Sequence, residues 1–187
     1  IDGLSKKEFI LSKFLVVASF AVASTIFVFI MSLILGYSFS SYNELSIVFT
    51  DLEYLFAFFI KLFFFFSFCL FLGILVKRSA FALGFLFVWF VAENIIYWII
   101  KFVILGGDDK HKNFGDTIIQ YFPIEAMSNL VKEPITRLSA IKTIENAVGG
   151  AQAAKDYSIH FSQISIVLVW TFIFILTSYY ILKKRDL

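Results

Sequence analysis

Residues 54–76 read YLFAFFIKLFFFFSFCLFLGILV, and this stretch decides the class of fold. It contains one charged side chain, Lys61, in a run long enough to cross a lipid bilayer, which takes about 20 mostly apolar residues in a helix. A barrel strand would alternate apolar and polar side chains, whereas this run is apolar on every face. The stretch therefore predicts a transmembrane helix.

Three further stretches meet the same criterion. Residues 14–36 and 161–182 are uncharged, and residues 80–105 contain the charged side chains Glu93 and Lys101. The 187 residues are 60% hydrophobic and 16% charged, whereas soluble domains are about half apolar and about a quarter charged. We predict an all-α integral membrane protein with four transmembrane helices, and we exclude a soluble enzyme.

Charges between the predicted spans set their orientation, because short cytoplasmic loops carry an excess of Lys and Arg. Three basic residues precede the first span, two lie in the turn 77–79, and three follow the fourth span in the tail 183–187. The loop 37–53 has none. We expect residues 1–13, the turn and the tail, and hence both termini, in the cytoplasm, and the loops 37–53 and 106–160 outside.

The long outer loop, residues 106–160, contains two predicted short helices. Pro123 and Pro134 suit the first position of a helix, and apolar residues follow each at offsets of three and four. These apolar residues are Ile124, Met127, Leu130 and Val131 in the first helix, and Leu138, Ile141, Ile144 and Val148 in the second. We expect the two helices to lie on the bilayer surface, to dip into it, or to cap the transmembrane bundle.

The sequence carries no recognisable catalytic or metal-binding motif. It lacks a GxxxxGK[ST] phosphate loop, an HExxH helix and a GxSxG turn, and its single cysteine, Cys69, lies inside an apolar run. We therefore expect no catalytic residue, no metal and no cofactor in this chain. The net charge of +2 does not indicate nucleic acid as a partner.

Two charged residues lie deep in predicted spans, where each costs about 2.5 kcal/mol or more at the bilayer centre. Lys61 precedes Lys77 by sixteen positions, and Glu93 follows it by sixteen. In an antiparallel hairpin the two charges would lie at the same depth, so we predict an intramembrane ion pair between them. The alternative is a charge on a translocation path or a proton relay.

Residues 2–14, DGLSKKEFILSKF, precede the first span. Ser5 and Glu8 have the spacing of a capping box, which predicts a helix that begins at about Ser5. Ile10 and Phe14 share an apolar arc, but Phe9 lies among polar residues. A pocket on a partner protein explains this phenylalanine better than lipid does, but the residues of the segment equally fit an interfacial helix held by anionic lipid.

This segment resembles the cytoplasmic coupling element between the second and third membrane helices of type-two ABC exporter permeases. Residues 121–130, YFPIEAMSNL, and the basic ending at residues 182–187 are also similar to that family. The family has six membrane helices and this chain shows four, so the resemblance implies two more helices upstream of Ile1.

The resemblance implies a permease subunit of an ATP-driven exporter in the bacterial cell (inner) membrane, with ATP hydrolysed by a partner and not by this chain. Its partners would be a cytoplasmic ABC ATPase, a second permease copy or paralogue, and membrane lipid. The residues that would contact the ATPase are Leu4, Ser5, Lys6, Lys7, Glu8 and Phe9. An ion-coupled secondary transporter or channel that uses Lys61 and Glu93 is the alternative, and an intramembrane hydrolase is a third hypothesis.

Overall fold

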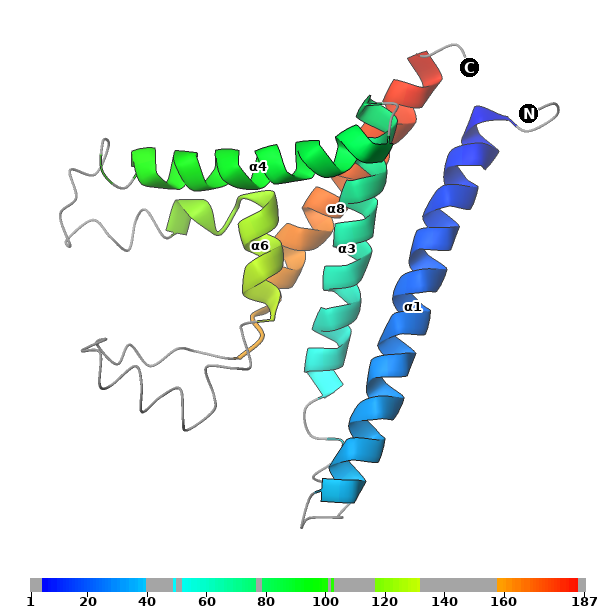
Figure 1. Cartoon of the computed structure of the whole chain (residues 1–187), viewed down its shortest axis with the longest axis vertical. Coiled ribbons are helices and arrows are strands. Elements are labelled where there is room, and N and C mark those ends of the chain that lie inside the picture. Colours follow the sequence, from blue (N-terminus) through cyan, green and yellow to red (C-terminus); the bar gives the residue numbers. More distant parts are fainter. Residues whose placement is uncertain are drawn as a thin grey trace.

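The structure is a computed structural model, and it describes residues 5–39, 49, 52–76, 79–100, 102, 117–131 and 158–184. This part of the chain is helical and contains no strand, which confirms the predicted all-α class. Its helices are α1 (Lys6–Phe39), α3 (Leu52–Val76), α4 (Ser79–Ile99), α6 (Pro123–Leu130) and α8 (Phe161–Lys184). The four long helices are apolar enough to cross a membrane (Figure 1).

Helix α3 lies at the centre of the packing. Its buried apolar side chains recur every three or four residues, which places them on one stripe of the helix. The ring of Phe174 on α8 lies 4.8 Å from that of Phe68 and 5.8 Å from that of Phe64, between centroids. On another side, Phe20 of α1 meets Phe66 edge-on at 5.1 Å. Aromatic rings therefore join α3 to both α1 and α8.

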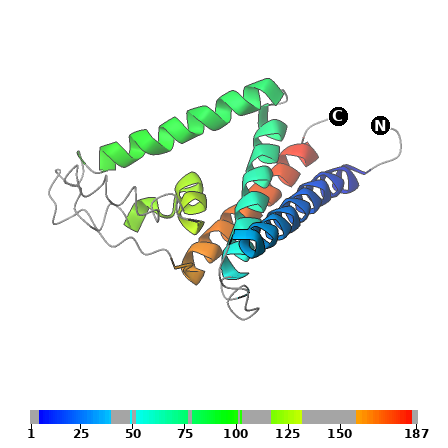
Figure 2. The same ribbon diagram turned by 60° about the horizontal axis from the view of Figure 1, so that its bottom comes forward.

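The predicted antiparallel hairpin of α3 and α4 is not observed. The two helices are in contact where the rings of Phe68 and Trp89 lie 5.5 Å apart. Farther along, α4 leaves α3 at a wide angle in both views (Figures 1 and 2). The short helix α6 packs beside α3 and α8 on the inner side of α4.

The start of α1 and the end of α8 lie at the same end of the molecule, as the predicted topology requires (Figure 1). Lys6 Nζ donates a hydrogen bond of 3.5 Å to the backbone carbonyl of Lys183. The apolar residues Ile10, Phe14 and Leu182 form a buried cluster just below. Which side of the bilayer this end faces stays a prediction.

One of the two helices predicted in the outer loop is present as α6, which begins at Pro123 as expected. Helix α6 packs against the long helices, because Pro123, Ala126 and Leu130 are buried there. The second, predicted between residues 134 and 149, lies outside the described residues.

Candidate functional site

Helix α6 begins without a capping side chain of its own. The N-cap residue is Phe122, in an extended conformation with φ −71° and ψ 144°, and it has no side-chain hydrogen bond to the helix. The first backbone N–H groups of a helix have no partner inside the helix and need an acceptor from elsewhere. In the interior of a membrane protein that acceptor has to come from another part of the protein.

Glu93 of α4 supplies this acceptor. Its carboxylate oxygens lie 3.2 Å from the backbone N of Ile124 and 3.3 Å from that of Glu125. The indole Nε1 of Trp89, one turn earlier on α4, donates a further hydrogen bond of 2.7 Å to the same carboxylate. A negative charge at a helix N-terminus is also favoured by the helix dipole. Glu93 therefore caps α6 from a different helix.

Lys61 of α3 lies at the opposite end of α6. Its Nζ donates to the backbone carbonyl of Val131, the C-cap residue, at 3.4 Å. A cation suits this position because the last carbonyls of a helix carry partial negative charge. The eight residues of α6 separate its two ends by about 12 Å.

The structure therefore does not bring the two predicted partners together. No ion pair between Lys61 and Glu93 is present among the described residues, and each binds its own end of α6 instead. The prediction assumed two antiparallel neighbours, whereas α4 diverges from α3 and α6 packs between them. The sequence carried one indication of this arrangement. Pro123 begins a helix, and no Ser, Thr, Asp or Asn stands before it to cap that helix, so the cap has to come from elsewhere.

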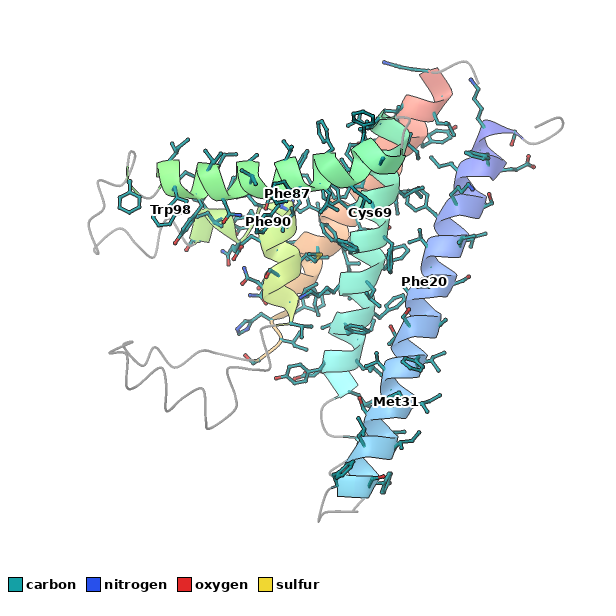
Figure 3. The ribbon with its side chains drawn as sticks, viewed as in Figure 1. Phe20, Met31, Cys69, Phe87, Phe90 and Trp98 are labelled. Atoms are coloured by element: carbon teal, nitrogen blue, oxygen red, sulfur yellow. The ribbon has the colours of Figure 1, made fainter. Side chains whose placement is uncertain are left out.

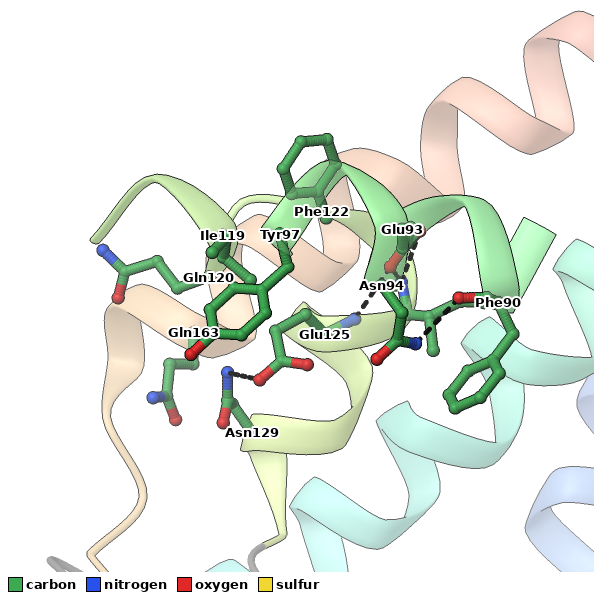
Figure 4. A pocket seen from close by; sticks show the side chains of 11 residues that line it. Phe90, Glu93, Asn94, Tyr97, Ile119, Gln120, Phe122, Glu125, Asn129 and Gln163 are labelled. Carbon is green, nitrogen blue, oxygen red and sulfur yellow. Dashed lines mark hydrogen bonds between the residues drawn. The ribbon is translucent and has the colours of Figure 1, made fainter. Parts of the chain in front are cut away.

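A cavity of about 460 Å³ opens beside Glu93, between α4, α6 and α8 (Figure 4). On one side of it, the amide of Asn129 donates to Glu125 Oε1 at 3.3 Å. Outside the lining, Trp170 Nε1 of α8 donates to the carbonyl of Tyr121 at 2.7 Å and so holds the segment before α6. The residues that line the cavity are Phe90, Glu93, Asn94, Tyr97, Ile119, Gln120, Phe122, Ile124, Glu125, Asn129 and Gln163.

The lining mixes two carboxylates and four side-chain amides with aromatic rings, and sequence reasoning did not identify it as a site. Its residues come from α4, from the turn before α6, from α6 itself and from α8, so no local sequence motif indicates the site. Among the described residues, no three His, Cys, Asp or Glu side chains are grouped so that they could hold a metal ion. The cavity can bind a ligand through carboxylate and amide oxygens as acceptors, amide N–H groups as donors, and aromatic rings.

At the other end of the molecule, the predicted capping box is formed. The amide and the hydroxyl of Ser5 each donate to Glu8 Oε2 at 2.8 Å, and the amide of Glu8 donates back to Ser5 Oγ at 3.2 Å. The hydroxyl and then the amide of Ser5 lower the pKa of the Glu8 carboxyl below its usual value. At 34 residues, α1 is about 50 Å long and exceeds the hydrocarbon thickness of about 30 Å, so these polar first turns extend beyond it.

The predicted ATPase-contact residues differ in their surroundings. Lys7 and Glu8 are exposed, and Leu4 lies outside the described residues. Phe9 is half-buried against the cluster of Ile10, Phe14 and Leu182, and the ammonium of Lys13 lies 5.4 Å from its ring centroid. Part of the Phe9 ring is thus already covered by this chain. The role of α8 in holding this segment was missed, because the two are far apart in sequence.

A family model described as ABC-2 family transporter protein matches residues 4–187. No curated protein and no solved structure matches the chain. The match covers nearly the whole sequence, including the capped start of α1, all four long helices and α6. This chain is therefore a membrane-embedded transport permease that belongs to the ABC-2 transporter family.

Proposed function

We propose that the chain is the transmembrane subunit of an ATP-driven exporter in the bacterial cell membrane and works with a separate cytoplasmic ABC ATPase. The observation that carries this proposal is the start of α1. A capping box begins the helix, and two charged side chains, Lys7 and Glu8, project into solvent beside it. This is a rigid, charged surface on which a soluble protein can dock.

The packing below that surface supports a mechanical role. Helix α1 is continuous from Lys6 to Phe39, so a displacement of its first turn moves the helix without an intervening hinge. Ile10 and Phe14 contact Leu182 at the end of α8, and α8 packs along α3. Closure of an ATPase at Lys7 and Glu8 would thus be transmitted to α3 and α8, and through them to α6. The chain itself would supply no catalytic group.

A second permease copy or a paralogue completes the proposed transporter. Apolar side chains on α1 and α4 are widely exposed, including Phe27 at 64% and Phe87 at 66%. In the membrane, lipid and a second permease subunit would share these surfaces, and the substrate path would lie where the two subunits meet.

The alternative, an ion-coupled carrier, was motivated by the two charged residues deep in the predicted spans. Lys61 and Glu93 hold the two ends of α6, and these contacts give both charges a structural role. Coupling to an ion gradient would require at least one of the two to be released from α6 during transport.

Charge reversal at the exposed start of α1 tests the proposed ATPase contact. The natural protein would be purified from its own membranes with Lys7→Glu or with the matched control Lys184→Glu, an exposed lysine at the same end of the molecule. We expect Lys7→Glu to lose most of the co-purifying P-loop ATPase, identified by mass spectrometry and ATP hydrolysis, while the control retains it. Equal recovery with both variants would contradict a contact at this surface, and a preparation without any P-loop ATPase would contradict the exporter itself.

A further inference from the structure

The cavity beside α6 has an unusual balance of charge. Among the described residues that line it, Glu93 and Glu125 carry carboxylates, and none is Lys, Arg or His. The two are neighbours, since the backbone N of Glu125 lies 3.3 Å from Glu93 Oε2. Two like charges near each other and partly removed from water are unfavourable, and either a positive group or protonation of one carboxyl relieves the repulsion.

The protein compensates the two carboxylates unequally, although Glu125 also lies in the first turn of α6, where the helix dipole favours a negative charge. Glu93 receives N–H groups from Trp89 and from the start of α6. Glu125 accepts a hydrogen bond at Oε1, from Asn129, and its Oε2 has no partner among the described residues. The carbonyl oxygen of Gln163, which also lines the cavity, is buried and has no partner in the same part of the chain. The unpaired Oε2 of Glu125 is therefore an acceptor that a positively charged donor in the cavity can use, whereas the Gln163 oxygen is too buried for a ligand to reach.

The size and the walls of the cavity indicate what kind of cation fits. At about 460 Å³ it lies in the range of pockets for organic ligands, about 300–1,000 Å³, and it is much larger than a bare inorganic ion. Three aromatic residues line the cavity: the ring of Tyr97 lies beside Glu125 and Gln163, and the rings of Phe90 and Phe122 lie at the edges of the lining (Figure 4). Aromatic faces combined with carboxylates are the surroundings in which proteins bind organic ammonium groups.

The surface next to the cavity can accept an alkyl chain. Phe90, Glu93 and Tyr97 reach the cavity from α4, and the same helix exposes apolar side chains to its surroundings (Figure 3). Phe87 and Trp98 are examples, at 66% and 53% exposed. A ligand could thus place a charged head in the cavity while its tail lies along α4 in the lipid.

We propose that the cavity between α4, α6 and α8 binds the primary ammonium group of an amphiphile, with Glu125 as the main anionic contact and Phe90, Tyr97 and Phe122 around it. The group can belong to an aminolipid headgroup or to a free alkylammonium compound. This site goes beyond the proposed exporter role, because binding to it requires no ATPase.

Calorimetric titration of the purified full chain in dodecyl maltoside micelles tests the site. The probes are hexylammonium, hexanol and hexanoate, which share one alkyl chain and differ in charge. We expect saturable binding of hexylammonium alone. Glu125→Gln should weaken it about tenfold or more, since hydrogen bonds to charged groups are among the strong ones. The matched control Glu53→Gln, an exposed carboxylate at the start of α3, should leave it unchanged.

A second variant guards against a folding defect in Glu125→Gln. Phe90 is 48% exposed, so Phe90→Leu should leave the fold intact and weaken hexylammonium binding about threefold through loss of a cation–π contact. Equal binding of all three probes, or no effect of either cavity variant, would overturn the proposal. Stronger binding of Ca²⁺ than of hexylammonium would overturn the assignment to an organic cation.

Adding lipid to the micelles separates the two sources of the ammonium group. Phosphatidylethanolamine would compete with hexylammonium if the site takes an aminolipid headgroup, whereas phosphatidylglycerol would not. Competition supports the proposal with a lipid as the ligand. Undiminished binding in the presence of phosphatidylethanolamine supports it with a free amphiphile as the ligand. Because no ATPase is present, failure of the ATPase co-purification would not affect this result.

Discussion

Helices α3 and α4 are consecutive in the sequence and both are strongly apolar, yet several phenylalanines of α3 are buried and those of α4 are exposed. On α3, Phe64 and Phe68 are 0% and 1% exposed, in the middle of a cluster of rings. On α4, Phe81 and Phe87 are 60% and 66% exposed. Lipid is as apolar as a protein core, so exposure of phenylalanine carries little cost in a membrane. Hydropathy therefore identifies both helices as spans but does not show which one is the core.

The divergence of the two helices also creates the candidate site. If α4 lay antiparallel along α3, as the sequence predicts, α6 could not pack against α3 and α8 on the inner side of α4. The wide angle leaves room for α6, and Glu93 and Lys61 then bind its two ends. Each helix thus contributes one charged residue to α6, and what distinguishes α4 from α3 is its exposed apolar surface.

The largest expected effect tests the core role of α3 against the exposed role of α4. Phe68→Ala should lower the free energy of unfolding by about 2 kcal/mol, mainly through the cavity that it leaves among closely packed rings. The matched change Phe87→Ala on α4 should cost less than about 0.5 kcal/mol, because lipid fills the space. Reversible unfolding in mixed micelles measures both. Similar losses at the two positions would mean that α4 is as closely packed as α3.

A smaller effect tests how the two helices are joined. Glu93→Gln should cost about 1 kcal/mol, because the cap of α6 loses its charge. Lys61→Met should cost less, since Lys61 makes a single long hydrogen bond, of 3.4 Å. Because each charge is compensated by α6, we expect the double variant to be no more stable than Glu93→Gln alone. A direct ion pair between α3 and α4 predicts the opposite, a double variant milder than either single change.

The smallest expected effect concerns α1. This helix is not part of the comparison of α3 with α4 and serves as a reference for it. The lowered pKa of Glu8 means that its interaction with Ser5 stabilises the fold fully above the usual pKa of a glutamate. This stabilisation is lost as the pH falls through the lowered pKa of the folded state. Ser5→Ala should shift the pKa of Glu8 upward, toward the usual value, in a carboxyl-carbon NMR titration. An unchanged pKa would show that the capping box does not persist in solution.

Much of this protein follows from local sequence. Long apolar runs predicted the membrane helices, because each run has to satisfy its own backbone hydrogen bonds inside lipid. Ser5 and Glu8 predicted the capping box, and Pro123 predicted the start of α6, because these are interactions within one or two helical turns. Lys61 and Glu93 were identified as charges that need compensation, because any charge in a span does.

What compensates those two charges was decided by the tertiary structure alone. Apart from the indole of Trp89, which is four residues before Glu93, the donors to Glu93 lie about thirty residues away in sequence, and the partner of Lys61 lies seventy away. The same holds for the cavity, whose lining comes from α4, α6, α8 and the turn before α6. Helix rotation and crossing angle set these contacts, and a helix that is apolar on every face carries no pattern that specifies either one. The sequence by itself determined which segments are helices and which charges are costly, and packing decided where those charges are used.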